Sequence, residues 1–170
     1  MKTRISLFFG MFAVMALSNA IVPVLPVYTD SSAVQAAIYS AYFLGAFLST
    51  LPAGILSDRY GRVPVIRTGL AITVASGFLL SVLVLPVPVI AARILEGVGA
   101  GFFVAAAMSY VNSLSDHEKM SGYLMASLNA GLVIGLVCAG WLAANFPSPA
   151  SGIFLFSALV IIPLMGSLFI

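Results

Sequence analysis

The sequence predicts an all-α membrane protein built as a single bundle of six helices. Of its 170 residues, 62% are hydrophobic and only 7% are charged, and the mean hydropathy is +1.17. Soluble domains carry about 25% charged residues, so this composition indicates an integral membrane protein. The apolar residues form long continuous runs without the period-2 alternation of a membrane β-barrel, which favours helices of roughly 20 residues that span the bilayer.

Hydropathy, together with the positions of polar residues and prolines, divides the chain into six spans. One membrane domain therefore covers residues 1–170, with helices expected at 5–28, 33–57, 65–85, 88–113, 119–144 and 151–170. Two of these starts fit a capping box, Ser32-x-x-Gln35 and Ser115-x-x-Glu118, in which the paired side chains satisfy backbone amides.

The first span has two interpretations. Lys2 and Arg4 precede an apolar run that ends in Ser18-Asn19-Ala20, which also fits a cleavable signal peptide. Because the apolar character continues as far as Tyr28, we favour an uncleaved first helix.

Two prolines and one polar side chain mark this first helix. Pro23 and Pro26 free backbone carbonyls and are expected to bend it, which is tolerated where a neighbour or a cavity satisfies them. Asn19 precedes them, and its side chain either lines a solute path or bonds to a neighbouring helix. The residues alone leave both possibilities open.

The cations in and around the connections lie on one side of this topology. Six of them flank the N-terminus and the second and fourth connections, namely Lys2, Arg4, Arg59, Arg62, Arg67 and Lys119, and the connections on the other side carry none. The positive-inside rule then places both termini and Asp58 in the cytoplasm. We expect an inner or plasma membrane of prokaryotic type.

Small residues recur at every fourth position in three spans. The rows are Ala41, Gly45, Ser49 and Ala53, then Gly97, Gly101, Ala105 and Ser109, and finally Ser127, Gly131, Gly135 and Ala139. Such rows let helices approach closely in lipid, either within one bundle or between bundles. Because three rows exceed what six helices need, we expect at least one to face another set of helices.

Arg93 and Glu96 are the only charged residues well inside a predicted span. Their i, i+3 spacing places them on one face of a helix, within reach of each other. Buried charges in membranes are by default functional candidates and are usually paired. Two interpretations stay open: Glu96 takes up and releases a proton, or it remains ionised as the structural partner of Arg93.

Several other kinds of site are excluded. Cys138 is the only cysteine, and His117 stands in a charged turn without a second His or Cys, so we expect neither a disulfide nor a metal site. The chain has no Ser–His–Asp arrangement, no phosphate-binding glycine loop and no basic patch for nucleic acid. An enzyme is therefore not expected, and no cofactor is implied.

One motif resembles the loop between helices 2 and 3 of the major facilitator superfamily of secondary transporters. It runs from Gly54 to Pro64, and Val63 stands where a second basic residue is usual. The resemblance implies a gating loop whose charge and capping contacts hold the outward-facing state, with glycines that permit a tight turn. The residues to which it assigns this role are Gly54, Asp58, Arg59, Gly61 and Arg62.

Two further motifs resemble the same family. Arg93 to Gly101 is similar to the helix 4 motif, whose arginine is implicated in proton coupling, with Glu96 in place of the usual glutamine. The helix 5 motif of proton-driven antiporters is matched by Gly131, Gly135 and Gly140, although Leu136 and Ala139 depart from it. Under this resemblance, Arg93, Glu96 and Asn19 serve proton coupling and the substrate path.

The resemblance covers the whole chain but only half of a family member, which has two six-helix halves of 3+3 inverted repeats. It implies a drug-efflux-like N-terminal half that exports a small amphipathic solute by proton-coupled antiport and alternating access. The partners would be the lipid bilayer, the solute and a second six-helix half, either in a longer chain or as a second copy in a homodimer. The alternative is a non-transporting assembly or accessory subunit.

Overall fold

The computed structural model describes the backbone of residues 2–168 and the side chains of residues 5–168. Within this part of the chain, the elements are α1 (Lys2–Ala20), η1 (Val22–Val24), α2 (Leu25–Tyr28), α3 (Ser32–Tyr60), α4 (Arg62–Val82), α5 (Pro86–Asn112), α6 (His117–Asn145) and α7 (Ser151–Leu168). Six segments are long and apolar enough to span a membrane, the first of them being Ile5–Tyr28. The predicted all-helical, six-span architecture is confirmed.

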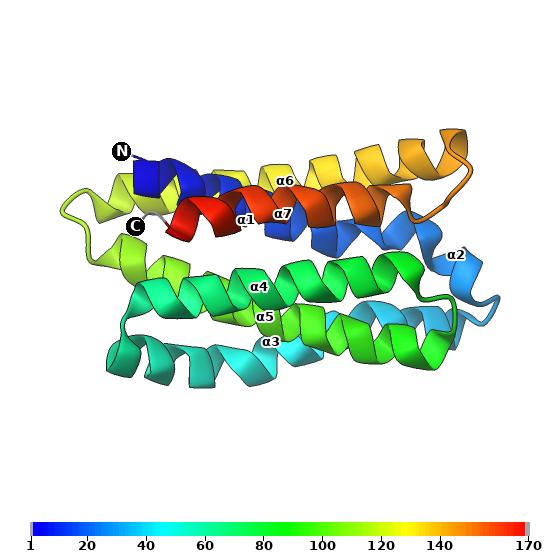
Figure 1. Cartoon of the computed structure of the whole chain (residues 1–170), viewed down its shortest axis with the longest axis horizontal. Coiled ribbons are helices and arrows are strands. Elements are labelled where there is room, and N and C mark those ends of the chain that lie inside the picture. The colour runs from blue at the N-terminus through cyan, green and yellow to red at the C-terminus, as the bar shows by residue number, and fades with distance from the viewer. Residues whose placement is uncertain (1, 169–170) are drawn as a thin grey trace.

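The helices form two groups of three, which Figure 1 shows one above the other. In one group α5 packs against α3 and α4, and in the other α1 packs against α6 and α7, while α4 and α7 join the two groups. The termini lie at the same end as the α3–α4 connection, here called the Asp58 end. The opposite end holds the connection after α2 and is called the Asp30 end.

The main helix–helix contacts map onto one another when α1 is exchanged with α5, α3 with α6, and α4 with α7. The α3–α5 contact then becomes the α6–α1 contact, the α4–α5 contact becomes the α7–α1 contact, and the α4–α7 contact maps onto itself. Such a pattern is expected when helices of two three-helix repeats interleave, as the family resemblance implied.

The first span is interrupted at the prolines that were expected to bend it. α1 ends at Ala20, a single 3-10 turn follows at Val22–Val24, and α2 continues to Tyr28. Pro23 and Pro26 lack the amide hydrogen that a regular α-helix would use, so the chain changes its hydrogen-bonding pattern at this point.

The segment around Asp58 is almost entirely helical, so the connection there is much shorter than the loop that was predicted. Asp58 and Arg59 lie in the last turn of α3, Arg62 begins α4, and Gly61 alone separates the helices. Gly61 has φ +90° and ψ 162°, a region essentially confined to glycine, whereas Gly54 lies within α3 and makes no turn. Charged residues mark where the chain leaves the membrane, but a helix can continue past that level because its long side chains reach water.

The two predicted capping boxes do not form as written. Ser31, not Ser32, precedes α3 without a side-chain capping bond, and Gln35 instead donates from Nε2 to the Thr29 carbonyl at 2.8 Å. α6 begins at His117, two residues before the predicted start. The polar patterns therefore located the helix starts but not their hydrogen bonds.

The rows of small residues in α3 and α5 pack against each other. A β-carbon at Gly45 would collide with the Ile94 carbonyl, and one at Gly97 would collide with the Tyr42 carbonyl. A β-carbon at Gly101 would meet the Ser49 hydroxyl. The absence of side chains at these glycines thus brings the two backbones into direct contact.

The row in α6 packs against α1 in the same way. A β-carbon at Gly131 would meet the Phe12 carbonyl, and one at Gly135 would meet the Ala16 carbonyl. All three rows therefore lie at contacts between helices inside the bundle. The expectation that at least one row would face another set of helices is wrong.

Candidate functional site

The predicted pairing of Arg93 and Glu96 is present in the structure. Nη1 of Arg93 donates to Oε2 of Glu96 at 2.5 Å, and both side chains are about 1% exposed. Arg93 is seven residues into α5, which places it about 10 Å from the Asp30 end of that helix. Two opposite charges are thus held together deep inside a membrane-spanning bundle.

Tyr42 of α3 covers the guanidinium of Arg93. The Arg93 Cζ atom lies 4.7 Å from the centroid of the Tyr42 ring, a distance at which the ring attracts a cation. Tyr42 is only 5% exposed, so its ring lies inside the bundle. The signal that was missed is the row of glycines: Gly97 admits the Tyr42 backbone beside α5, and the ring then meets Arg93.

Arg93 also lines a cavity of about 280 Å³ between helices of both groups. The cavity is bounded by α1, α3, α5 and α6, and its other lining residues are Met15, Ser18, Asn19, Tyr39, Tyr42, Phe43, Leu128 and Leu132. This lining is mostly apolar and aromatic with few polar groups, as is typical of small-molecule sites.

Asn19 makes the bond to a neighbouring helix that was one of the two interpretations, and it also lines the cavity. Its Nδ2 donates to the Leu132 carbonyl of α6 at 3.0 Å, and the residue lines the cavity. Asn19 therefore joins α1 to α6 while contributing a polar surface to the cavity beside Arg93.

Three polar atoms of the Arg93–Glu96 pair have no hydrogen-bond partner among the described residues. They are Nε and Nη2 of Arg93 and Oε1 of Glu96, and all three are buried. Buried polar atoms are nearly always hydrogen-bonded, because leaving one unpaired costs free energy. The pair is therefore not a self-satisfied structural bridge.

The residues of the Asp58 motif lie at the other end of the bundle. The Asp58 carboxylate is exposed and makes no hydrogen bond or ion pair with the described residues. Arg59 lies over the Tyr60 ring at 5.3 Å, and Arg62 donates from Nε to the Ser109 hydroxyl of α5 at 3.1 Å. The motif therefore contributes one link between α4 and α5 and one uncommitted carboxylate.

Arg67 was counted in the sequence only as a cation, yet it links the two helix groups. Its Nε and Nη2 donate to the Ser167 carbonyl at 3.0 and 2.6 Å, which ties α4 to the last turn of α7. Its positive charge was the only signal in the sequence, and that charge does not identify a partner 100 residues away.

The glycines of the helix 5 motif differ in what they contact. Gly131 and Gly135 face the α1 backbone, whereas a β-carbon at Gly140 would make only ordinary contacts with Pro23. The structure therefore brings Arg93, Glu96 and Asn19 into one region and places the Asp58 motif elsewhere.

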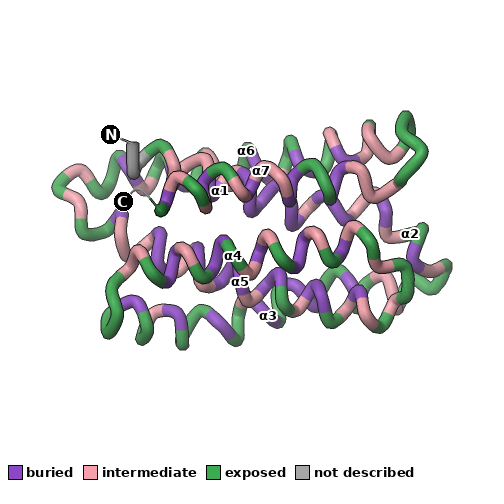
Figure 2. The backbone as a smooth tube through the Cα atoms, in the orientation of Figure 1, coloured by how far each residue is buried: buried purple, intermediate pink, exposed green. Residues whose placement is uncertain are grey.

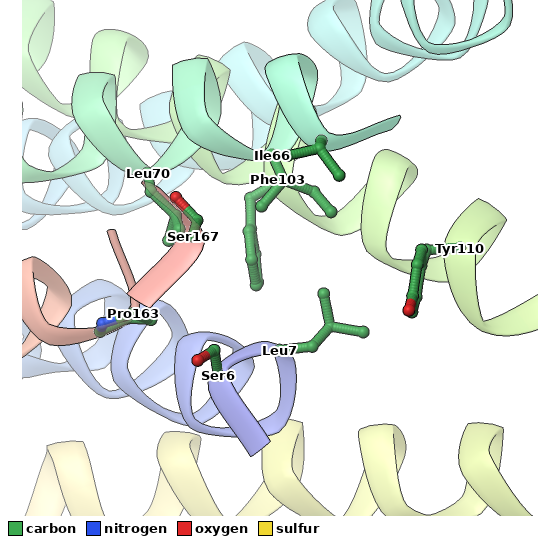
Figure 3. Close-up of a pocket in the computed structure, with 9 residues that line it drawn as sticks. Ser6, Leu7, Ile66, Leu70, Phe103, Tyr110, Pro163 and Ser167 are labelled. Atoms are coloured by element: carbon green, nitrogen blue, oxygen red, sulfur yellow. The ribbon is translucent and has the colours of Figure 1, made fainter. Parts of the chain in front are cut away.

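A second, smaller cavity of about 20 Å³ lies at the Asp58 end between α1, α4, α5 and α7. Figure 3 shows Leu7, Ile66, Leu70 and Phe103 around it, with Ser167 and Tyr110 at its margin. A cavity of this size holds about one water molecule, and its lining is too apolar to retain one well. It is not a candidate solute site.

Comparisons with known proteins agree with this arrangement. The family model described as Major Facilitator Superfamily matches residues 7–170. A multi-drug resistance efflux pump, PmrA, from Streptococcus pneumoniae is 36% identical over 140 residues, which cover 75% of this chain and 33% of that protein.

Two further relatives span similar parts of the chain. Multidrug resistance protein 2 from Bacillus subtilis is 28% identical over 158 residues, covering 88% of this chain and 39% of that protein. Probable anion transporter 6, chloroplastic, from Arabidopsis thaliana is 32% identical over 127 residues, which cover 72% of this chain and 25% of that protein. The chain thus spans well under half the length of these relatives. It is an integral membrane protein that belongs to the major facilitator superfamily.

Proposed function

We propose that this chain is the N-terminal half of a secondary transporter that exports a small amphipathic solute in exchange for protons. The observation that carries the proposal is the buried Arg93–Glu96 pair, which has unpaired polar atoms and whose Arg93 lines a cavity between the two helix groups. Burying a charged pair at this depth costs free energy, and such pairs usually mark sites of binding or coupling. Relatives described as multidrug resistance proteins favour an amphipathic solute.

The surfaces of α3 and α6 support the presence of a second six-helix half. These spans are the least buried of the six, and Figure 2 shows exposed positions recurring along both. On α3 the exposed large apolar residues include Phe43, Leu44, Phe47, Leu48, Leu51 and Ile55, and on α6 they include Val133, Val137 and Trp141. In our proposal, part of this surface packs against the other half and the rest faces lipid.

The second half is tested by the protein-only mass in mild detergent, measured by light scattering. The chain has a mass of 17.7 kDa. A value near twice that mass would support a homodimer of half-size copies, and a value near 17.7 kDa would mean that this chain lacks its partner under those conditions. Transport is then measured on whichever assembly is complete.

The Asp58 motif is proposed to gate the transporter at the cytoplasmic side, with both termini on that side. The exposed, unpaired Asp58 carboxylate is free to bind a donor on the second half, while the Arg62–Ser109 bond fixes the start of α4. We expect Asp58→Asn to lower solute flux at least tenfold without lowering the unfolding temperature by more than a few degrees. Asp30→Asn, a change of an exposed carboxylate at the opposite end, is the matched control.

Transport itself is tested by flux in proteoliposomes that contain the complete assembly. We expect a pH gradient, acidic in the compartment from which protons enter, to drive uphill movement of a lipophilic fluorescent dye. Glu96→Gln removes the exchangeable proton with little change in shape, so dye movement should lose its dependence on the gradient. Unchanged flux in both Asp58→Asn and Arg93→Gln/Glu96→Gln would overturn the proposal in favour of an accessory membrane subunit.

A further inference from the structure

We propose that the unpaired edge of the Arg93 guanidinium is a receptor for a carboxylate on an aromatic solute. This inference rests on the proposed transport function and names the class of solute that the cavity takes. It follows from which atoms of Arg93 are bonded, what holds them in place and what surrounds them.

The two unpaired nitrogens of Arg93 form one edge of its guanidinium. Glu96 occupies Nη1, whereas Nε and Nη2 have no partner in the described part of the protein. The N–H groups of Nε and Nη2 point in the same direction and form a two-donor fork, the geometry that binds both oxygens of a carboxylate. A lone carbonyl oxygen offers one acceptor to this fork, and an ammonium group offers none.

The fork is held in place before any solute arrives. The Tyr42 ring lies 4.7 Å from the Arg93 Cζ, and the Glu96 carboxylate holds the remaining nitrogen. Arg93 is 1% exposed, so it cannot satisfy these donors by reaching bulk water. A guanidinium that is already oriented loses little conformational freedom when it binds a carboxylate.

The cavity beside Arg93 fits the remainder of such a solute. Tyr39, Phe43, Leu128 and Leu132 provide flat aromatic and aliphatic surface, and its volume of about 280 Å³ suits a fused two-ring group. Among the lining residues, Arg93 is the only one that carries a charge. An aromatic ring would therefore pack among apolar side chains with its carboxylate directed at the single cation.

The experiment compares three probes that share one ring system. 2-Naphthoate offers two acceptor oxygens, 2-naphthamide offers one, and 2-naphthylmethylamine carries a positive charge. Binding to the complete assembly in lipid nanodiscs is measured by equilibrium dialysis, with empty nanodiscs subtracted for partition into lipid. We expect naphthoate to bind roughly tenfold or more tightly than the amine, with the amide in between, because only naphthoate fills both bonds to the charged fork.

Variants of the pair then identify the receptor. Arg93→Gln/Glu96→Gln removes both charges together and should abolish the preference for naphthoate. Glu96→Gln alone should tighten naphthoate binding severalfold, because it removes a competing carboxylate from the same guanidinium. Lys119→Gln changes an exposed cation at the start of α6, at the Asp58 end, and should leave the ratio of naphthoate to amine binding unchanged.

If the double variant fails to fold, Arg93→Lys provides a second test of the receptor. Arg93→Lys retains the positive charge but lacks the two-donor fork, so it should reduce the naphthoate preference over the amide more than the preference over the amine. Equal binding of all three probes, or a naphthoate preference that survives in the double variant, would overturn the inference. A preference for the amine would instead make Glu96 the receptor.

Failure of this inference is distinguishable from failure of the proposed function. Dye flux that depends on Glu96, without any naphthoate preference, would leave a transporter with a different class of solute. A naphthoate preference without flux of naphthoate or dye would leave a binding site in a protein that does not transport.

Discussion

Two contacts in this protein use the same means of close packing, but only one contains charge. In the α3–α5 contact, Gly45 and Gly97 let the backbones touch, and α5 also carries the buried Arg93–Glu96 pair. In the α1–α6 contact, which takes the equivalent place when the two repeats are exchanged, Gly131 and Gly135 do the same. The only polar link between these two helices in the described residues is the bond from Asn19 to Leu132.

The difference shows that close helix packing here does not require the charged pair. α1 and α6 reach backbone contact through small residues and one neutral hydrogen bond, so the same geometry is available without burying an ion. Buried ion pairs are seldom a net gain over apolar side chains of similar volume. The Arg93–Glu96 pair is therefore better explained by ligand or proton chemistry than by packing.

The largest loss of stability is expected when one charge of the Arg93–Glu96 pair is removed. We expect Arg93→Gln to destabilise the protein by about 3–5 kcal/mol, because the Glu96 carboxylate is left buried without its cation. Thermal unfolding in detergent, followed by loss of the monodisperse peak in size-exclusion chromatography, measures the effect.

The double variant Arg93→Gln/Glu96→Gln tests whether the loss of stability comes from the unpaired Glu96 charge. It should recover most of the lost stability, because two neutral side chains replace two charges, while transport stays absent. If the double variant were as unstable as Arg93→Gln alone, the charges would be needed for packing, and the contrast between the two contacts would fail.

A β-carbon added to the glycines should affect both contacts to a similar degree. Gly97→Ala places a methyl group against the Tyr42 carbonyl, and Gly135→Ala places one against the Ala16 carbonyl. Overpacking of this kind costs about 1–3 kcal/mol, since a backbone must move. The same unfolding assay measures both variants.

Gly54→Ala is the matched control, because nothing lies within 4 Å of a β-carbon at that position of α3. It should be neutral or slightly stabilising, as alanine is the better helix former. A large loss in Gly97→Ala with none in Gly135→Ala would show that the two contacts are not built alike.

Asn19→Ala tests the one polar link of the α1–α6 contact. Hydrogen bonds between membrane helices contribute about 0.6 kcal/mol on average, so we expect a small loss of stability. Solute affinity should change more than stability, because Asn19 also lines the cavity. Asn129→Ala, which removes an amide that bonds only within exposed α6, is the control for affinity.

The smallest effect is expected at the Asp58 end. Ser109→Ala removes the acceptor of the Arg62 bond at 3.1 Å, and Arg62 is only partly buried, so water can replace the lost partner. A loss of about 0.5 kcal/mol or less is expected. Ser40→Ala, at an exposed serine of α3, sets the baseline, and a loss several times larger at Ser109 would mean that the Arg62 bond is structural.

The sequence was sufficient for the features that depend on local chemistry. Hydropathy and the positions of polar residues and prolines located the six spans, Pro23 and Pro26 marked the interruption after α1, and the i, i+3 spacing placed Glu96 beside Arg93. Each of these follows from the preferences of neighbouring residues along one helix.

Features that depend on distant parts of the chain were not accessible in this way. A row of glycines predicts close approach but does not identify the partner, so the α3–α5 and α1–α6 pairings had to come from the structure. For the same reason, the sequence did not place the Tyr42 ring beside Arg93. The charges of Asp58 and Arg59 suggested a loop, whereas α3 continues as a helix through both residues to Tyr60.

The single residue between α3 and α4 has a mechanical consequence. Two peptide units join Tyr60 to Arg62, so their Cα atoms are never more than about 7 Å apart. A force applied to the Asp58 end of α3 is therefore passed directly to α4, with no slack in between. Arg67 passes it on to the end of α7. The Asp58 end then behaves as a stiff corner through which a pull on one helix turns its neighbours together.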